Sequence, residues 1–408
     1  MGSGMWQAVS GRETGSERGR RYIVKTDTGR LHHLDALRAF AMIYGIFLHT
    51  TTLGDFGVLE VLPVLSDHFR MASFFLVSAM LSAAVLGKRS PGAFVRRRLL
   101  TILVPLGTAL ILLNPVTLAL VALYHNPEVG FSIPAAVVAS FEDPSLLQGP
   151  LIWHLHLWFL FSLAAYALVL PPAAALARLR QDELERLAGR LPAWSRLPAL
   201  GLLVMALGLT IRVAAELLIP GLHDIWLVSA TLRYLPYVLA GVLVFLVPSL
   251  RSAMERTNWT VLGMGALAIA AEIVLGSRDS TAAKLILFGF KYLSTFAMVH
   301  LLMILFARWA SKPSRAVMLI IRSIFTVYLV HYLLIYAFAL AIRPLGLSDW
   351  GIFLVVSVLT LGTGLAFHFG LVARVGVLRF LLNGDLRRTP SPVAPAAMVG
   401  TAGDGRSP

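Results

Sequence analysis

One arginine and one histidine in the first apolar segment are placed to do chemistry together. Arg38 and His49 are separated by ten residues, so on a helix they lie eleven steps, or roughly 16 Å, apart along the axis. Eleven steps are close to three full turns, and both side chains therefore point to one side of the helix. Since histidine exchanges its proton near neutral pH, in a dry pocket it can remove a proton from a hydroxyl. His49 is the candidate base; packing between helices is its alternative role.

A run of basic residues follows the second apolar segment. Lys88, Arg89, Arg96, Arg97 and Arg98 are five cations within eleven positions. The planar guanidinium of arginine matches the oxygens of a phosphate group, which favours a clamp for a phosphorylated ligand. The same composition is typical of a membrane edge anchored by phospholipid headgroups. Composition alone leaves both interpretations open.

Three polar residues come just before the second apolar segment. Asp67, His68 and Arg70 follow the first outer loop, and we expect them to cluster at the outer mouth of a bundle. Arg70 carries N–H donors that can stabilise a developing oxyanion, which is often the largest single contribution to catalysis. Three cations in later apolar segments, Lys291, Arg322 and Arg374, are expected to extend to a membrane surface.

Aromatic residues and histidines recur in two later segments. The fourth apolar segment opens with WHLHLWFL, which contains His156 and Trp158. These residues form either an aromatic belt at the membrane interface or a platform on which a sugar ring stacks. The ninth segment contains SIFTVYLVHYLLI, where Tyr328 and His331 lie one turn apart. Since no His-x3-His pattern with a carboxylate accompanies these histidines, we predict no metal site.

The composition identifies the elements that must position these residues. Of 408 residues, 57% are hydrophobic and 14% are charged, and the mean hydropathy is +0.77. A soluble domain carries about a quarter charged residues, so a soluble globular enzyme is excluded. The absence of cysteine excludes a thiolate nucleophile, an iron–sulfur cluster and a thiolate zinc site. The net charge of +14 fits arginines retained on the cytoplasmic side of a membrane better than nucleic-acid binding.

Ten apolar stretches are long enough to cross about 30 Å of hydrocarbon as helices. They are apolar all round, which predicts an all-α polytopic bundle rather than a barrel. The outer loop 125–150 is expected to contain an interfacial helix at 131–141. The ten predicted spans are 35–53, 71–87, 99–124, 151–177, 198–219, 225–247, 258–276, 284–307, 316–342 and 351–382.

Charge counting predicts the orientation and the domain boundaries. Lys and Arg number 25 in the segments on the side of the N-terminus and only 4 in the intervening segments. Positive residues are retained in the cytoplasm, so both termini are predicted to be cytoplasmic. We expect a polar tail over 1–34 without a cleavable signal peptide, a transmembrane domain over 35–382, and a disordered cytoplasmic tail over 383–408.

Five motifs in a fixed order carry a resemblance to a known family. They are R-x10-H in the first span, FRM-x2-FF in the second, RRRLLTILVP before the third, HLWFL in the fourth and VYLVH in the ninth. Together they cover roughly residues 31–342, and the chain resembles the acyltransferase-3 family of integral membrane acyltransferases. Within that family it is most similar to a branch whose members succinylate periplasmic glucans. One departure is Thr101, which stands where the family often has the second arginine of R-x2-R.

The resemblance implies an activity, a location and roles for residues. An acyl group would move from cytoplasmic acyl-CoA, with succinyl-CoA favoured, to a hydroxyl of a periplasmic glucan across a bacterial inner membrane. His49 would be the essential histidine with Arg38 as its partner, and Arg96, Arg97 and Arg98 would contribute to the donor site. No cofactor is expected to be bound permanently. The expected partners are acyl-CoA, an oligosaccharide or glucan and the lipid bilayer, with no nucleic acid.

Two alternatives remain open from the residues alone. An O-acetyltransferase of lipopolysaccharide, exopolysaccharide or a small glycoside would use the same chemistry. A transporter of a lipid-linked sugar or anion would also explain charges inside the membrane. For an acyltransferase, the acceptor or oxyanion side is assigned to Asp67, His68, Arg70, His156, Trp158, Tyr328 and His331, of which Arg70, Trp158 and Tyr328 are the candidate oxyanion donors.

Overall fold

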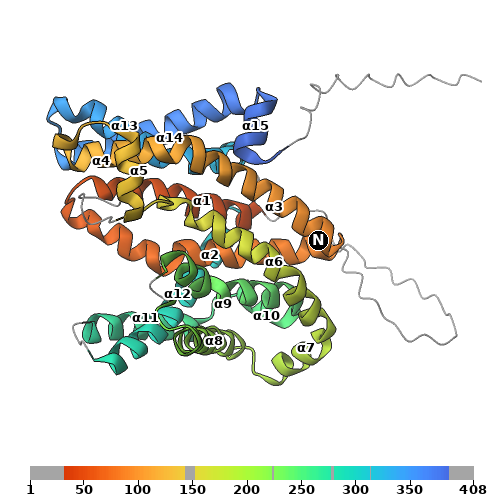
Figure 1. Ribbon diagram of the computed structural model, residues 1–408. Coiled ribbons are helices and arrows are strands. Elements are labelled where there is room, and N and C mark those ends of the chain that lie inside the picture. Colours follow the sequence, from red (N-terminus) through yellow and green to blue (C-terminus); the bar gives the residue numbers. More distant parts are fainter. Residues whose placement is uncertain (1–31, 143–151, 223–224, 277–279, 313, 386–408) are drawn as a thin grey trace, which may run out of the picture. The chain divides into compact units, whose positions relative to one another are not determined.

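The computed structural model describes residues 32–142, 152–222, 225–276, 280–312 and 314–385 (Figure 1). These residues form helices and connecting turns, and no β-strand occurs among them. The predicted all-α class is therefore confirmed. The predicted tails lie almost wholly outside the described residues, and the division of the chain into tails and a membrane domain stays a prediction.

The long helices correspond to the predicted spans. Their bounds are α1 His32–Thr50, α2 Val61–Leu86, α3 Pro91–Thr108, α4 Asn114–His125, α6 Trp158–Leu179, α8 Arg196–Leu218, α9 Trp226–Leu246, α11 Trp259–Leu275, α12 Thr281–Trp309, α13 Arg315–Ile342 and α14 Asp349–Phe367. The π-helical segment η3 (Ala109–Leu113) joins α3 to α4 in one continuous span, and a second, η8 (His368–Val372), extends α14.

Four shorter helices and several 3₁₀ turns connect the long helices in the described part of the chain. The helix α5 (Ile133–Glu142) confirms the helix expected over 131–141. The other short helices are α7 (Gln181–Arg190), α10 (Pro248–Met254) and α15 (Gly376–Asn383), and one of the 3₁₀ turns is η5 (Leu155–Leu157).

The number of membrane crossings follows from where the described chain begins and ends. Nine helical stretches among the described residues are long and apolar enough to span a membrane, and the bent pair α10–α11 raises the number to ten. Arg38, near the start of α1, and Asp385, the last described residue, line one cavity. A chain whose described part begins and ends at the same end of the bundle crosses it an even number of times. Ten spans, as predicted, satisfy this condition.

Three predicted spans differ from the structure by eight or more residues at one end, and the third span is one of them because it starts at Pro91 rather than residue 99. The second span begins ten residues before the predicted start, at Val61 rather than residue 71. The polar residues Asp67, His68 and Arg70 lower the hydropathy there, but inside the bundle they have partners, and the helix continues through them. The tenth apolar stretch ends at Val372 rather than residue 382, because the chain turns after η8 and continues as the separate helix α15.

Helix α2 lies at the centre of the bundle. It packs against α1, α9, α12 and α6, and most of its residues are buried. On the other side of α1 lie α13 and α14, while α8 packs on α9 (Figure 1). The α2–α9 contact is close because Gly241 has no side chain: a Cβ atom there would lie 2.3 Å from the Leu76 carbonyl oxygen.

Candidate active site

Three helical elements bring three histidines together. His49 is the last residue but one of α1, His156 lies in the turn η5, and His331 lies on α13. Their ring centroids are 6.3 Å apart for His49 and His156, 5.2 Å for His49 and His331, and 4.7 Å for His156 and His331. We call these three residues the histidine cluster. Tyr332 packs against it, 4.9 Å from His49 and stacked on His156 at 5.2 Å.

The turn that carries His156 is held in an unusual backbone conformation. Leu155 has φ 43°, the one positive value among the described non-glycine residues. Such conformations cost about 1–3 kcal/mol and persist only where the surrounding structure fixes them. The side chain of Asn114 donates to the Trp153 carbonyl, and the Tyr328 hydroxyl donates to the His156 carbonyl at 2.8 Å. These bonds hold the turn against α4 and α13.

The tautomer of His331 is defined by a carbonyl group. Its Nδ1 lies 2.6 Å from the Tyr328 carbonyl oxygen, which can only accept, so Nδ1 carries the proton and Nε2 of the neutral ring is an acceptor. Among the described residues, His331 Nε2 and both ring nitrogens of His156 are buried without a hydrogen-bond partner. The two histidines are 2% and 8% exposed. Buried polar atoms are nearly always paired, so these nitrogens are candidates to bind a ligand or an ordered water.

Arg70 is the cation beside the histidine cluster. Its Nε donates to Ser66 Oγ at 2.8 Å, and its Nη1 would lie 3.0 Å from a Cβ atom at Gly45. Gly45 lies one turn before His49 on α1. The Arg70 guanidinium is close enough to interact electrostatically with all three histidines.

Asp67 and His68 belong to a separate charge network that joins four helices. Arg233 on α9 donates to both carboxylate oxygens of Asp67 at 3.0 Å, and Lys291 on α12 lies 2.9 Å from Asp67 Oδ2. On α11, Glu272 lies 3.0 Å from His68 Nε2. Lys291 therefore points into the bundle rather than to a membrane surface, contrary to the sequence expectation.

Asp67, His68 and Arg70 were expected to form one cluster at an outer mouth. His68 and Arg70 lie roughly 200° apart around α2, so the three residues do not form one cluster.

Trp158 is joined to that network through Tyr234, whose ring lies under the Arg233 guanidinium. Its ring stacks on Tyr234 at 6.1 Å and meets Trp226 edge-on at 6.4 Å. Trp226 is 52% exposed at the start of α9. Within the described residues the Trp158 ring has no ring contact with the histidine cluster. The neighbouring His154 is buried just before the fourth span, and burial lowers the pKa of its imidazole.

The arginine run lies within a helix rather than in a turn before one. Ser90 caps α3 by accepting from the Ala93 N–H, and Pro91 occupies the first helical position, a typical helix start. The next turns place Phe94, Arg97, Arg98 and Thr101 on one face. Arg96 points away from that face and is exposed.

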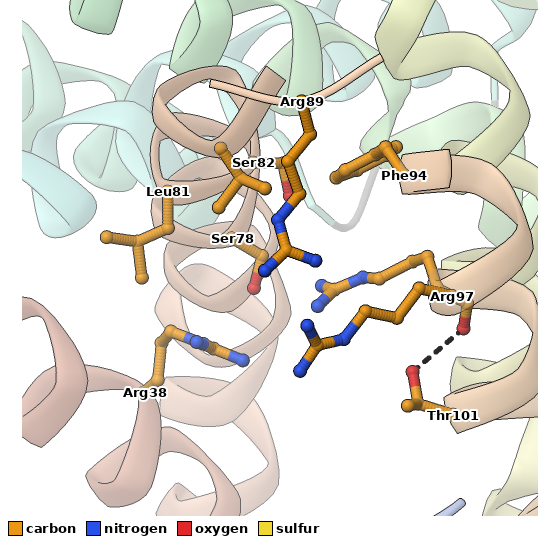
Figure 2. A pocket seen from close by; sticks show the side chains of 10 residues that line it. Arg38, Ser78, Leu81, Ser82, Arg89, Phe94, Arg97 and Thr101 are labelled. Atoms are coloured by element: carbon orange, nitrogen blue, oxygen red, sulfur yellow. Dashed lines mark hydrogen bonds between the residues drawn. The ribbon is translucent and has the colours of Figure 1, made fainter. Parts of the chain in front are cut away.

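A cavity of about 420 Å³ lies against that face of α3. It is lined by four arginines, Arg38, Arg89, Arg97 and Arg98. Figure 2 shows that the labelled arginines converge from α1, from the turn between α2 and α3, and from α3. Arg96 is not among the described residues that line it. Arg38 is oriented by the Phe74 ring, whose centroid lies 4.8 Å from the guanidinium carbon, and its Nε is buried without a partner among the described residues.

A second cavity, of about 790 Å³, adjoins the first and shares Arg38, Arg98 and Thr101 with it. One wall is apolar and aromatic. The other lining residues come from α13, η8, α15 and the segments that follow η8 and α15: Arg322, His368, Ala373, Arg379, Asn383 and Asp385. Arg322 therefore borders a cavity, whereas the sequence suggested only that it extends to a membrane surface.

The aromatic wall leads from the arginines to the histidine cluster. Phe159 and Phe325 line the second cavity, and their rings lie 5.4 Å and 6.3 Å from that of Tyr328. Tyr328 in turn bonds to the backbone of His156 and accepts from His331. The predicted arginines and histidines thus form two groups with packed aromatic rings between them. Asp67, His68 and Trp158 belong to neither group.

Several residues of this arrangement were not identified from the sequence. Tyr332, Arg379 and Asn383 gave no distinct signal, because an aromatic residue in an apolar helix or a cation near a chain end is common. Arg233, which pairs with Asp67, is an arginine inside an apolar span, and that feature is a signal. Among the described residues, no group of three or more His, Asp or Glu is arranged to hold a metal ion.

Comparison with known proteins identifies one family. The sequence model of the acyltransferase-3 family, described as an acyltransferase domain, matches residues 31–369. No curated protein and no solved structure matches the chain.

Proposed function

The chain belongs to the acyltransferase-3 family, and we propose that it transfers an acyl group from cytoplasmic acyl-CoA to a carbohydrate hydroxyl on the far side of the membrane. A multi-pass membrane acyltransferase follows from the family and from the apolar helices. The donor, the acceptor, the bacterial inner membrane and the cytoplasmic termini belong to the proposal.

The observation that supports this proposal most strongly is the series of aromatic rings between the arginines and the histidine cluster. The nucleotide of CoA is highly charged and cannot enter hydrocarbon cheaply, so it would stay among the arginines at the end where α1 begins. Its thin pantetheine arm is largely neutral and could pass Phe159 and Phe325 to reach Tyr328. The thioester would then lie beside His49, near the opposite end of α1.

The proposed reaction is a direct acyl transfer. His49 removes the proton from the acceptor hydroxyl as its oxygen attacks the thioester carbonyl carbon. Arg70 donates to the oxyanion that forms on the carbonyl oxygen. The oxyanion then collapses and the carbon–sulfur bond breaks. The leaving CoA thiolate takes the proton that His49 removed from the hydroxyl, and the products are an ester and free CoA. His331 Nε2, an acceptor in the neutral ring, would orient the hydroxyl or hold a water beside His49.

Among the three candidate oxyanion donors, Arg70 fits the role best. The Tyr328 hydroxyl already donates to the His156 carbonyl, and Trp158 stacks away from the cluster on Tyr234. A succinyl donor also carries a free carboxylate, which needs a cation. Lys291 is a second cation that could bind this carboxylate, but it is already paired with Asp67. Arg70 is therefore the residue that we expect to bind the free carboxylate of a succinyl donor.

The favoured acceptor is a periplasmic glucan, by similarity to the branch of glucans biosynthesis protein C. The aromatic rings of Trp158, Trp226 and Tyr234 would offer stacking surfaces for sugar rings near the outer side. Asp67 and His68 were predicted on the acceptor side. They would support these stacking surfaces indirectly, through the charge network that holds α9 and α11 against α2.

The proposal is tested with purified protein in lipid nanodiscs. Acyl-CoA and an oligosaccharide glucan are supplied, and acylated product is measured by mass spectrometry. Wild-type protein should form an ester, and His49→Ala should lower turnover by about 10²–10⁴-fold, the usual contribution of a general base. His125→Gln, outside the histidine cluster, is the matched control. If His49→Ala kept more than half of wild-type turnover, His49 would not be the base; if wild-type protein moved the glucan without acylating it, a transporter would be the better description.

A further inference from the structure

The second cavity is lined by two arginines that do not come from α3. Arg322 on α13 and Arg379 on α15 line it together with Asn383 and Asp385. We call these four residues the α15 lobe, and Arg89 with Arg97, which line the first cavity alone, the α3 lobe. Arg38 and Arg98 lie between the two lobes because they line both cavities.

The helix α15 is fastened to the rest of the bundle beside this cavity. Gly384 follows it with φ 62°, and a Cβ atom there would lie 2.4 Å from Thr101 Cα and 2.8 Å from the Leu100 carbonyl oxygen. Only glycine allows this approach. The chain after α15 therefore lies directly on the α3 backbone, three residues after Arg98.

A buried polar contact holds the other side of α15. Thr326 is fully buried; its hydroxyl donates to Asn383 Oδ1 at 3.1 Å and lies 2.8 Å from His368 Nδ1. This contact ties α15 to α13 and to the π-helical segment η8, which also borders the cavity. π-helical turns of this kind are frequent at functional sites. The position of the α15 lobe is thus fixed by packing on two neighbouring helices.

The charges of the two lobes match a ligand with two separate anionic groups. CoA carries a 5′-diphosphate, to which its pantetheine arm is attached, and a 3′-phosphate on the ribose. Thr101 lines both cavities without adding a charge, whereas Arg322 and Arg379 place two guanidinium groups along the same cavity. Guanidinium groups bind phosphate oxygens in a fork geometry. Asp385, the acidic residue among those lining the two cavities, could accept from the exocyclic amine of adenine.

We propose that the α15 lobe binds the 3′-phosphoadenosine end of the acyl donor, while the α3 lobe with Arg38 and Arg98 binds the diphosphate. This inference rests on the proposed acyl-CoA donor. It makes α15 a part of donor recognition, with Arg322 and Arg379 as the residues that distinguish CoA from a nucleotide lacking the 3′-phosphate.

The test compares CoA with dephospho-CoA, which lacks only the 3′-phosphate. Dissociation constants of both are measured by titration calorimetry on the full chain in nanodiscs. Wild-type protein should prefer CoA by about tenfold or more, the effect of one charge-assisted contact. Arg322→Gln and Arg379→Gln should each lose most of this preference by weakening CoA alone. Arg89→Gln and Arg97→Gln should weaken both ligands and keep the preference.

Arg374→Gln is the matched control, because Arg374 is exposed beside α15 and is not among the described residues that line either cavity. Arg322 is exposed as well, so its substitution is not expected to disturb folding even if that of Arg379 does. If the preference for CoA persisted in Arg322→Gln and disappeared in the α3-lobe variants, the assignment of the two lobes would be overturned. If wild-type protein bound neither ligand, the proposed donor itself would be wrong.

Discussion

His156 and His331 keep three ring nitrogens buried and unpartnered among the described residues. Leaving a buried polar atom without a hydrogen bond costs about 1–3 kcal/mol, so a ligand or a water that bonds to these nitrogens would stabilise the cluster. The motifs HLWFL and VYLVH indicated that these histidines matter. Their tautomers and their distance from His49 could not be predicted, because they depend on a carbonyl of Tyr328 and on the turn at Leu155.

Arg70 offers the sharpest prediction at the residue scale. If its guanidinium binds the carboxylate of a succinyl donor, Arg70→Gln should lower kcat/KM for succinyl-CoA at least tenfold more than for acetyl-CoA. If it acts only on the oxyanion, both donors should lose activity equally, since the oxyanion is common to both. Initial rates with the two donors measure the difference. A wild-type enzyme that uses only acetyl-CoA would contradict the succinyl assignment and favour an O-acetyltransferase.

The helix α3 directs three consecutive arginines to different sides, so that only some of them can bind a ligand in the cavity. Arg96, Arg97 and Arg98 were predicted together as donor residues, but consecutive residues on a helix point 100° apart. The helix start at Ser90 and Pro91 was readable in the sequence, but which two neighbouring arginines border the cavity depends on where the cavity lies, and it is lined by Arg97 and Arg98. The partners of these two arginines could not be read, because Arg38 and Phe74 come from other helices.

This geometry predicts unequal roles within the arginine run. Arg97→Gln and Arg98→Gln should each weaken acyl-CoA binding by about tenfold or more, since a charge-assisted hydrogen bond contributes about 1.5–3 kcal/mol. Arg96→Gln should change the affinity less than twofold and serves as the matched control for net charge. Equal losses at all three positions would indicate that the run acts through its overall charge, as an anchor at the membrane edge.

The close packing of α2 on α9 gives a second prediction at the element scale. Gly241→Ala places a methyl group against the Leu76 backbone carbonyl, so the two helices must separate, at a cost of about 1–3 kcal/mol. Gly263→Ala is the control, because its Cβ would meet nothing within 4 Å and alanine favours a helix. Thermal unfolding in detergent should show a lower midpoint for Gly241→Ala and an unchanged or higher one for Gly263→Ala. Equal midpoints would show that α2 and α9 are not held by this contact.

For the whole molecule, hydropathy predicted most of the architecture, and the orientation inferred from charge stays a prediction. Long apolar runs can cross a membrane only as helices, and this physical constraint is why the ten spans were found. Hydropathy failed where polar residues find partners inside the bundle. Asp67 pairs with Arg233, 166 residues away, and no local pattern predicts such a partner. The same limit explains why the two cavities and the role of α15 became visible only in the structure.

The central claim is that the acyl group crosses the membrane within the protein, from the arginine side to the histidine side. Proteoliposomes test it directly, with glucan trapped inside and acyl-CoA added outside. The chain lacks cysteine, so single cysteines at Ser90 and Ser132, labelled with an impermeant maleimide, report which end of the bundle faces outward. Vesicles with residue 90 outward should accumulate acylated glucan in the lumen, and His49→Ala vesicles should not. If acylated glucan formed only when acyl-CoA and glucan were supplied on the same side, the account of transfer across the membrane would be contradicted.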